Sequence, residues 1–127
     1  MAKLRIVLVD DVKEVRDAVA ELLGNTGHEI VAEANDGAAG VEAALAHGPD
    51  LVLMDWHMPG MEGIEATRQI RASCPGAAII AFCSTDTPEL RDAFRTAGAE
   101  AFVDKRDVRG LIAAVDAVAR SRTSSDE

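Results

Sequence analysis

Four charged side chains from distant parts of the chain have residue types that suit a site for a divalent cation. Asp10, Asp11 and Asp55 each follow a short apolar run directly, and Lys105 lies at the end of another. Three carboxylates that meet in a partly desolvated crevice repel one another unless a cation holds them. Oxygen ligands alone favour a hard ion such as Mg²⁺, which leaves positions for phosphate oxygens. The residue types therefore predict a Mg²⁺ site with Lys105 at its rim, paired with Asp55 at rest.

The elements that must position these side chains are short apolar runs that alternate with helical patterns. The runs are residues 6–9, 30–32, 51–54, 79–83 and 101–103. The helical stripes, which we interpret as core, are Val12, Val15, Val19 and Leu22, then Leu90, Ala93, Phe94 and Ala97, and finally Val108, Leu111, Ile112, Val115 and Val118. Five repeats of strand and helix predict an α/β fold with helices on both faces of a parallel sheet.

The order of the strands decides whether the acids meet. The weak run EIVAEA alternates with acids, which suits an edge strand. Right-handed crossovers then favour the doubly wound, flavodoxin-like five-stranded parallel sheet, with strand order 2-1-3-4-5. Its crevice lies at the carboxyl ends of strands one and three, which are followed by Asp10, Asp11 and Asp55. We therefore expect these three acids to meet.

Each residue taken alone has a simpler interpretation. Asp10 and Asp11 are suitable N-caps for the helix that follows them. Asp55 is a suitable turn residue before Met58-Pro59-Gly60, and a lone lysine at position 105 is usually solvated. The combination favours the site, because capping preferences alone do not place suitable charges at three strand ends.

Composition limits the classes of function. The 127 residues, 48% of them hydrophobic, fit one domain. A formal net charge of −9 argues against a nucleic-acid-binding surface. Cys74 and Cys83 form no metal or disulfide pattern, so a reducing, cytoplasmic setting is expected. No stretch has the length of a secretory signal or membrane span, so no membrane partner is expected.

Three segments carry a resemblance to a known family. VLVDDV at 7–12, LVLMDWHMPGMEGIEATRQIR at 51–71 and TAGAEAFVDK at 96–105 resemble the receiver domain of two-component response regulators, and the resemblance covers nearly the whole chain. It implies that Asp55 accepts a phosphoryl group from a sensor histidine kinase or a phosphotransfer protein. It further implies that Asp10, Asp11, Asp55 and the backbone carbonyl of His57 hold Mg²⁺. Lys105 would contact the phosphoryl oxygens, and attack by water on the mixed anhydride would return the site to its starting state.

The switch residues depart from the family pattern. In receivers a Ser or Thr that ends strand four turns toward the phosphoryl group, and an aromatic residue on strand five follows it. Here Phe102 takes the aromatic position and Cys83 the hydroxyl position, although a thiol is a weak donor. Ser84 is the next residue, and we expect it, rather than Cys83, to contact the phosphoryl group. Which of the two takes the switch role stays open.

Three further positions carry smaller predictions. Arg106 follows Lys105 where many receivers have proline, so a trans peptide bond is expected. His57 is either an inert loop residue or a gate for the attacking water. Trp56, the only tryptophan, adjoins Asp55 and should report Mg²⁺ binding by fluorescence.

The resemblance also implies an interaction surface and leaves alternatives. Receivers dimerise or bind targets through the face formed here by the helical pattern at 90–97, the run at 101–103 and the helical pattern at 108–118. We expect a receiver domain at 1–120 and a polar tail or linker at 121–127, so an output domain after residue 127 stays open. The alternatives are a degenerate receiver that binds partners without phosphorylation, a Mg²⁺-dependent aspartyl phosphatase and, less favoured, a flavin or nucleotide carrier. An aspartyl phosphatase would need a D-x-D arrangement after strand one, and a carrier would need a phosphate loop there; DDVKEV offers neither.

Overall fold

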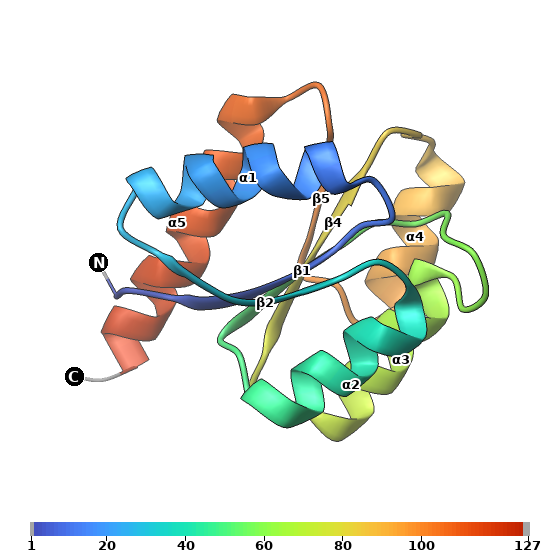
Figure 1. Ribbon diagram of the computed structural model, residues 1–127, viewed down its shortest axis with the longest axis horizontal. Helices are drawn as coiled ribbons and strands as arrows, with labels where there is room; N and C mark the ends of the chain where they lie inside the picture. Colours follow the sequence, from blue (N-terminus) through green and yellow to red (C-terminus); the bar gives the residue numbers. More distant parts are fainter. Residues whose placement is uncertain (1, 126–127) are drawn as a thin grey trace.

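A five-stranded parallel sheet in the order β2-β1-β3-β4-β5 forms the centre of the molecule in the computed structural model, which describes residues 2–125 (Figure 1). This confirms the predicted doubly wound order and the edge position of strand two. The strands are β1 (Arg5–Val9), β2 (Glu29–Ala34), β3 (Leu51–Met54), β4 (Ala78–Cys83) and β5 (Ala101–Asp104). The helices are α1 (Lys13–Asn25), α2 (Gly37–His47), α3 (Gly63–Ser73), α4 (Pro88–Ala97) and α5 (Val108–Ser125).

Helices cover both faces of the sheet, which explains why β3 and β4 are apolar at every position. In Figure 1, α1 and α5 lie on one face, and α2, α3 and α4 lie on the other. Every residue of β3 and β4 is buried. Because successive strand residues point to opposite faces, the side chains of each strand divide between two core layers. Leu53 contacts the layer under α1 and α5, whereas Met54 contacts the layer under α2, α3 and α4.

Every residue of the predicted helical stripes is buried or half-buried except the first residue of two of them. Val12 and Val108, both assigned to the core, are 41% and 48% exposed. Val12 precedes the first turn of α1 and Val108 begins α5, so neither has a helical turn before it to direct its side chain onto the sheet. Leu23, which lay outside the predicted stripe, is buried instead. The helical period predicts which face of a helix is buried, but the residue at which the helix begins decides which residue is the first to be buried on that face.

Helix α5 runs further than the expected domain boundary at residue 120. The backbone is helical through Ser125, so much of the expected polar tail continues the last helix. The division into a receiver domain and a tail or linker remains a prediction, and residues 126–127 lie outside the described part of the chain. None of the helices within residues 2–125 is long and apolar enough to cross a membrane.

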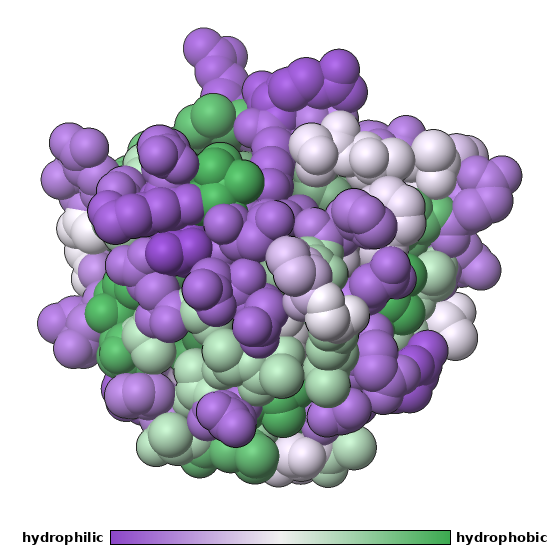
Figure 2. Space-filling view, turned by 45° about the vertical axis from the view of Figure 1, so that its right-hand side comes forward, coloured by the Kyte–Doolittle hydropathy of each residue, from purple (hydrophilic) through white to green (hydrophobic). Residues whose placement is uncertain are grey.

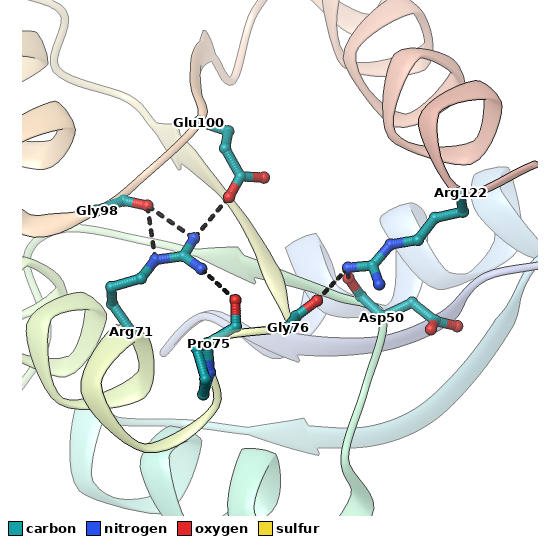
Figure 3. A network of polar contacts seen from close by, with 7 residues as sticks. All are labelled: Asp50, Arg71, Pro75, Gly76, Gly98, Glu100 and Arg122. Carbon is teal, nitrogen blue, oxygen red and sulfur yellow. Dashed lines mark hydrogen bonds and ion pairs between the residues drawn. The ribbon is translucent and has the colours of Figure 1, made fainter. Parts of the chain in front are cut away.

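Two arginines tie the chain together at the amino ends of the strands, away from the acids (Figure 3). Arg71 of α3 donates to the carbonyl of Gly98 from Nε (3.2 Å) and Nη2 (2.8 Å), and it donates to the carbonyl of Pro75 (3.0 Å). Its guanidinium also pairs with Glu100 at 2.6 Å. Arg122 of α5 donates to the carbonyls of Asp50 and Gly76 in the same region. These contacts satisfy carbonyls of the loops that precede the strands, and the carbonyl of Asp50 also accepts from the amide of Ala78 of β4 at 2.9 Å.

The opposite, carboxyl end of the sheet is brought toward the viewer in Figure 2. The upper part of this face is largely hydrophilic, whereas pale apolar surface gathers in its lower part, on the side of α2 and α3. Helix α2 is rich in alanine and carries Leu45, which is 59% exposed.

Candidate phosphorylation and metal site

Three strands of the sheet, β1, β3 and β5, deliver the predicted charges to one place. Val9 at the end of β1 pairs with Met54 at the end of β3, so the residues that follow them leave the sheet side by side. The amide of Asp55 donates to the carbonyl of Val9 at 2.9 Å, which continues the ladder by one residue. On the far side of β3 the amide of Lys105 donates to the carbonyl of Cys83 at 2.8 Å. The backbone hydrogen bonds of the parallel sheet therefore position Asp55 and Lys105 independently of side-chain contacts.

The three carboxylates meet as the strand order predicted. One oxygen of each of Asp10, Asp11 and Asp55 lies within 4.8 Å of the others. Asp10 and Asp55 are 5% and 7% exposed, whereas Asp11 is open to solvent. A donor set made only of carboxylate oxygens, with one exposed member, fits a hard cation that retains waters, and Mg²⁺ has these preferences. The residues present therefore fit the predicted ion.

Lys105 reaches between the two buried carboxylates. Its Nζ lies 2.7 Å from Asp10 Oδ2 and 3.3 Å from Asp55 Oδ1. The predicted pairing with Asp55 is present, but the shorter contact is to Asp10. Burial alone would lower the pKa of Lys105; the hydrogen bond to Asp10 and the charges of both acids outweigh it, so that the pKa is raised. Lys105 is therefore a fixed cation beside Asp55.

Asp10 uses its two carboxylate oxygens differently. Oδ1 accepts the amide hydrogen of Val12 at 2.9 Å, and Oδ2 faces Lys105. Val12 occupies the N-cap position of α1, and no side chain there caps the helix. Arg16, one turn into α1, donates to the backbone carbonyl of Asp10 at 2.7 Å and pairs with Glu33 of β2 at 3.0 Å. The residues after β1 thus contact both the side chain and the backbone carbonyl of Asp10. Asp10 is not the N-cap of α1, since Val12 occupies that position.

The surroundings of Asp55 disfavour its ionised form. Burial, and then the charge of Asp10, raise its pKa above the ordinary aspartate value, and Lys105 opposes this shift. Its Oδ1 accepts the amide hydrogen of Trp56 at 2.8 Å, which orients the carboxylate. Electrostatic strain at a buried, oriented carboxylate is characteristic of reactive and ion-binding positions.

A pocket of about 400 Å³ opens over Asp55. It is lined by Asp11, Val12, Asp55, Trp56, His57, Cys83, Ser84, Thr85 and Lys105. Cys83 is 1% exposed, and burial followed by the charge of Asp55 raises the pKa of its thiol to about 12. Ser84 and Thr85 are exposed. Thr85 was not among the residues predicted for the site, although a hydroxyl residue in the loop after a strand that borders the site is the signal that could have found it.

The remaining predicted positions surround this pocket. Phe102 is half-buried on β5, and its ring meets that of Phe94 edge to face at 5.9 Å between centroids. The peptide bond between Lys105 and Arg106 is trans, as expected, since residues 2–125 contain no cis bond. The side chain of His57 is 78% exposed, and its Nδ1 lies 3.6 Å from Glu62 Oε1. This position is compatible with an inert loop residue and with a gate.

The sequence and the fold are similar to those of known signalling proteins. A family model described as the response regulator receiver domain matches residues 6–116. The chemotaxis protein CheY of Bacillus subtilis is 42% identical over 103 residues, which cover 80% of this chain and 84% of CheY. The transcriptional regulatory protein PdtaR of Mycobacterium tuberculosis is 40% identical over 120 residues, which cover 93% of this chain and 58% of PdtaR. The chain thus spans little more than half of PdtaR, and a match to a methylesterase of Natronomonas pharaonis covers 22% of that enzyme.

Solved structures agree with these relatives. A two-component response regulator of the LuxR family from Aurantimonas superposes with a TM-score of 0.89 at 34% identity, over 94% of this chain and 87% of that one. The signal receiver domain of NarL from Mycobacterium tuberculosis superposes with a TM-score of 0.85 at 30% identity, over 93% of this chain and 98% of that one. The family match over residues 6–116 includes residues of all five strands.

Proposed function

Since this chain belongs to the response regulator receiver family, we propose that it is a phosphoacceptor module in which Asp55 takes a phosphoryl group from a phosphohistidine. The observation that carries the proposal is the meeting of Asp10, Asp11 and Asp55 within 4.8 Å, with Lys105 beside them. The donors we propose are a sensor histidine kinase or a histidine phosphotransfer protein. Receiver domains are generally not enzymes, and here too the transfer would be catalysed only in cis.

The chain's own residues perform most of the proposed chemistry. A carboxylate oxygen of Asp55 forms a bond to phosphorus while the bond from phosphorus to the imidazole nitrogen breaks, and the imidazole leaves as a neutral ring after taking a proton. The amide of Trp56 holds one carboxylate oxygen of Asp55 in place, and Asp55 lines the pocket. Lys105 faces the nucleophile and is placed to neutralise charge on the transferred group.

Mg²⁺ is the proposed cofactor, held by Asp10, Asp11, Asp55 and the backbone carbonyl of His57. When bound, it neutralises charge on the phosphoryl oxygens, which a cluster of three carboxylates would otherwise repel. Asp10 and Asp11 supply the acidic ligands, and Lys105 balances the charge of Asp10. The carboxylate cluster is also what distinguishes this proposal from a degenerate receiver, which has no need to retain it.

Phosphorylation is proposed to alter the face made by α4, β5 and α5. A phosphoryl group adds about −1.5 to −2 charge at Asp55 and strong acceptor oxygens. Ser84 is the proposed donor to these oxygens, with Cys83 as the other candidate for the switch position and Phe102 as the responding ring. We propose that the altered face binds a target or a second copy of the chain. We propose that the receiver domain spans residues 1–120, with a tail or linker at 121–127.

Intact mass measurement after incubation with acetyl phosphate and Mg²⁺ tests the phosphoacceptor role. The wild-type protein should gain the mass of one phosphoryl group, and EDTA should abolish the gain. Asp55→Asn should remain unmodified, whereas Asp50→Asn, which changes an aspartate that precedes β3 at the opposite end of the sheet, should be modified like the wild type. A wild-type protein that stays unmodified would support the degenerate receiver, and equal modification of Asp55→Asn would place the acceptor elsewhere.

A further inference from the structure

An arginine on α4 covers the ring of Phe102. The guanidinium carbon of Arg91 lies 4.9 Å from the centroid of the Phe102 ring, a geometry in which the cation is attracted to the π face. Phe94, three residues further along the same helix, meets the same ring in an edge-to-face contact. Phe102 is therefore held by two side chains of α4, one apolar and one charged.

Arg91 is itself held by the loop that borders the phosphorylation site. Its Nε lies 2.6 Å from Asp86 Oδ1, and its Nη2 lies 2.9 Å from Asp86 Oδ2, so the pair is bidentate. Asp86 is two residues beyond Ser84, in the loop between β4 and α4 that lines the pocket over Asp55. A bidentate pair fixes the plane of a guanidinium as well as its position. The carboxylate of Asp86 thus determines how Arg91 lies over the ring.

The ion pair of Arg91 with Asp86 contributes little to the free energy of unfolding, so its main effect is on the position of the Arg91 side chain. The side chain of Arg91 is 50% exposed, and exposed ion pairs add little to the free energy of unfolding. A second pair, Arg106 with Asp104, stands close enough for the charges of Asp104 to act on Arg91. The charge of Asp104 therefore favours the charged form of Arg91, although the pair of Arg91 with Asp86 stays partly exposed.

We propose that Arg91 is a positioning residue that transmits movement of the loop containing Ser84 and Asp86 to the ring of Phe102. When the loop closes on a phosphoryl group at Asp55, Asp86 moves with the loop. The guanidinium of Arg91, which is bound to Asp86, then changes its position over the ring of Phe102. This link supplies a route between the site and β5 that does not depend on a hydroxyl at position 83 or on a tyrosine at position 102. The inference rests on the proposed phosphoacceptor function.

The ring resonances of Phe102, measured by NMR in protein labelled at phenylalanine, test the link. The site is titrated with Mg²⁺ and beryllofluoride, and Trp56 fluorescence reports its occupancy. In the wild type the Phe102 resonances should change with occupancy. In Arg91→Gln most of this change should be lost, while the apparent affinity reported by Trp56 shifts by no more than about fivefold, the size of a cation–π contact at an exposed site.

Arg95→Gln is the matched control. Arg95 lies on the same helix and borders the same surface groove as Phe102, but it pairs with Asp92 of its own helix. This variant should retain the response of the ring. Asp86→Asn should reproduce Arg91→Gln, and the double variant should show no further loss, because both changes break one link. Urea unfolding midpoints of all variants should match the wild type.

Two failures are distinguishable. If beryllofluoride binds, as reported by Trp56, and the Phe102 resonances of Arg91→Gln respond as in the wild type, the role of Arg91 is wrong and the phosphoacceptor proposal stands. If beryllofluoride with Mg²⁺ does not bind the wild-type protein, the proposed function fails and the inference fails with it.

Discussion

Replacement of Gly63 by alanine should displace the backbone of Asp55. Gly63 is the first residue of α3, and its amide donates to the carbonyl of Trp56 at 2.8 Å. A Cβ atom at this position would lie 1.8 Å from the carbonyl oxygen of Asp55. Raising this separation to 3.0 Å, below which real Cβ contacts essentially never occur, requires about 1.2 Å of movement. Either the start of α3 or the backbone of the phosphoacceptor must supply it.

The size of the effect follows from two opposed contributions. Alanine is favoured over glycine in a helix by roughly 0.5–1 kcal/mol, whereas overpacking of a buried contact costs about 1–3 kcal/mol. Because the clash is between a Cβ atom and backbone, which has no rotamer to change, we expect the upper end of that cost and a net loss of about 2 kcal/mol. A displacement near 1 Å at a reacting group lowers rates by up to about 100-fold. We expect phosphorylation to slow by about tenfold, since α3 absorbs part of the movement.

Urea unfolding and the rate of modification by acetyl phosphate measure the two effects. Gly24→Ala is the matched control, because Gly24 lies inside α1 and a Cβ atom there has nothing within 4 Å. It should stabilise the protein by about 0.5–1 kcal/mol and leave the modification rate unchanged. A Gly63→Ala variant that is as stable as the wild type and is phosphorylated at the same rate would refute the reasoning.

Three further predictions concern charge, thiol reactivity and loop carbonyls. Burial and Asp10 raise the pKa of Asp55, so its ionised form is disfavoured in the folded protein, and stability is lost as pH rises from the unfolded value through the folded one. In EDTA, Asp55→Asn should therefore be more stable than the wild type at pH 7 and lose this advantage toward pH 3; urea midpoints that differ equally at both pH values would contradict this. The pKa of about 12 at Cys83 leaves only about 10⁻⁴ of the thiol ionised at pH 8, so iodoacetamide should label half-buried Cys74 first, and peptide mapping that finds equal rates would count against it. Arg71→Ala should lower the free energy of unfolding by about 1–3 kcal/mol, because it leaves the partly buried carbonyl of Gly98 unpaired, while phosphorylation continues; a loss below about 0.5 kcal/mol would be inconsistent with Figure 3.

The sheet and the meeting of the acids were predictable because both follow from strand order. Continuous apolar runs fix which segments are buried on two faces, and right-handed crossovers fix their order. Once β1 and β3 are neighbours, Asp10 and Asp55 must leave the sheet together. This conclusion requires no knowledge of side-chain geometry, so it can be predicted from the sequence alone.

Side-chain choices within the site were not predictable in the same way. Lys105 has acids on two strands within reach, and its closer approach to Asp10 depends on rotamers and on the turn that Arg16 holds. The contact of Arg91 with Phe102 joins a helix to a strand through a loop acid, and no sequence period encodes such a contact. The role of Gly63 likewise depends on how closely a helix start approaches a strand end.

The central claim is that Asp55 carries the phosphoryl group, and borohydride trapping tests it most directly. Borohydride reduces an aspartyl phosphate to homoserine, so peptide mass spectrometry after treatment with acetyl phosphate, Mg²⁺ and borohydride locates the acceptor. The structure predicts homoserine at position 55 and, under the same conditions, none at Asp10 or Asp11. Homoserine at another aspartate, or a phosphorylated protein with no homoserine at all, would contradict the account.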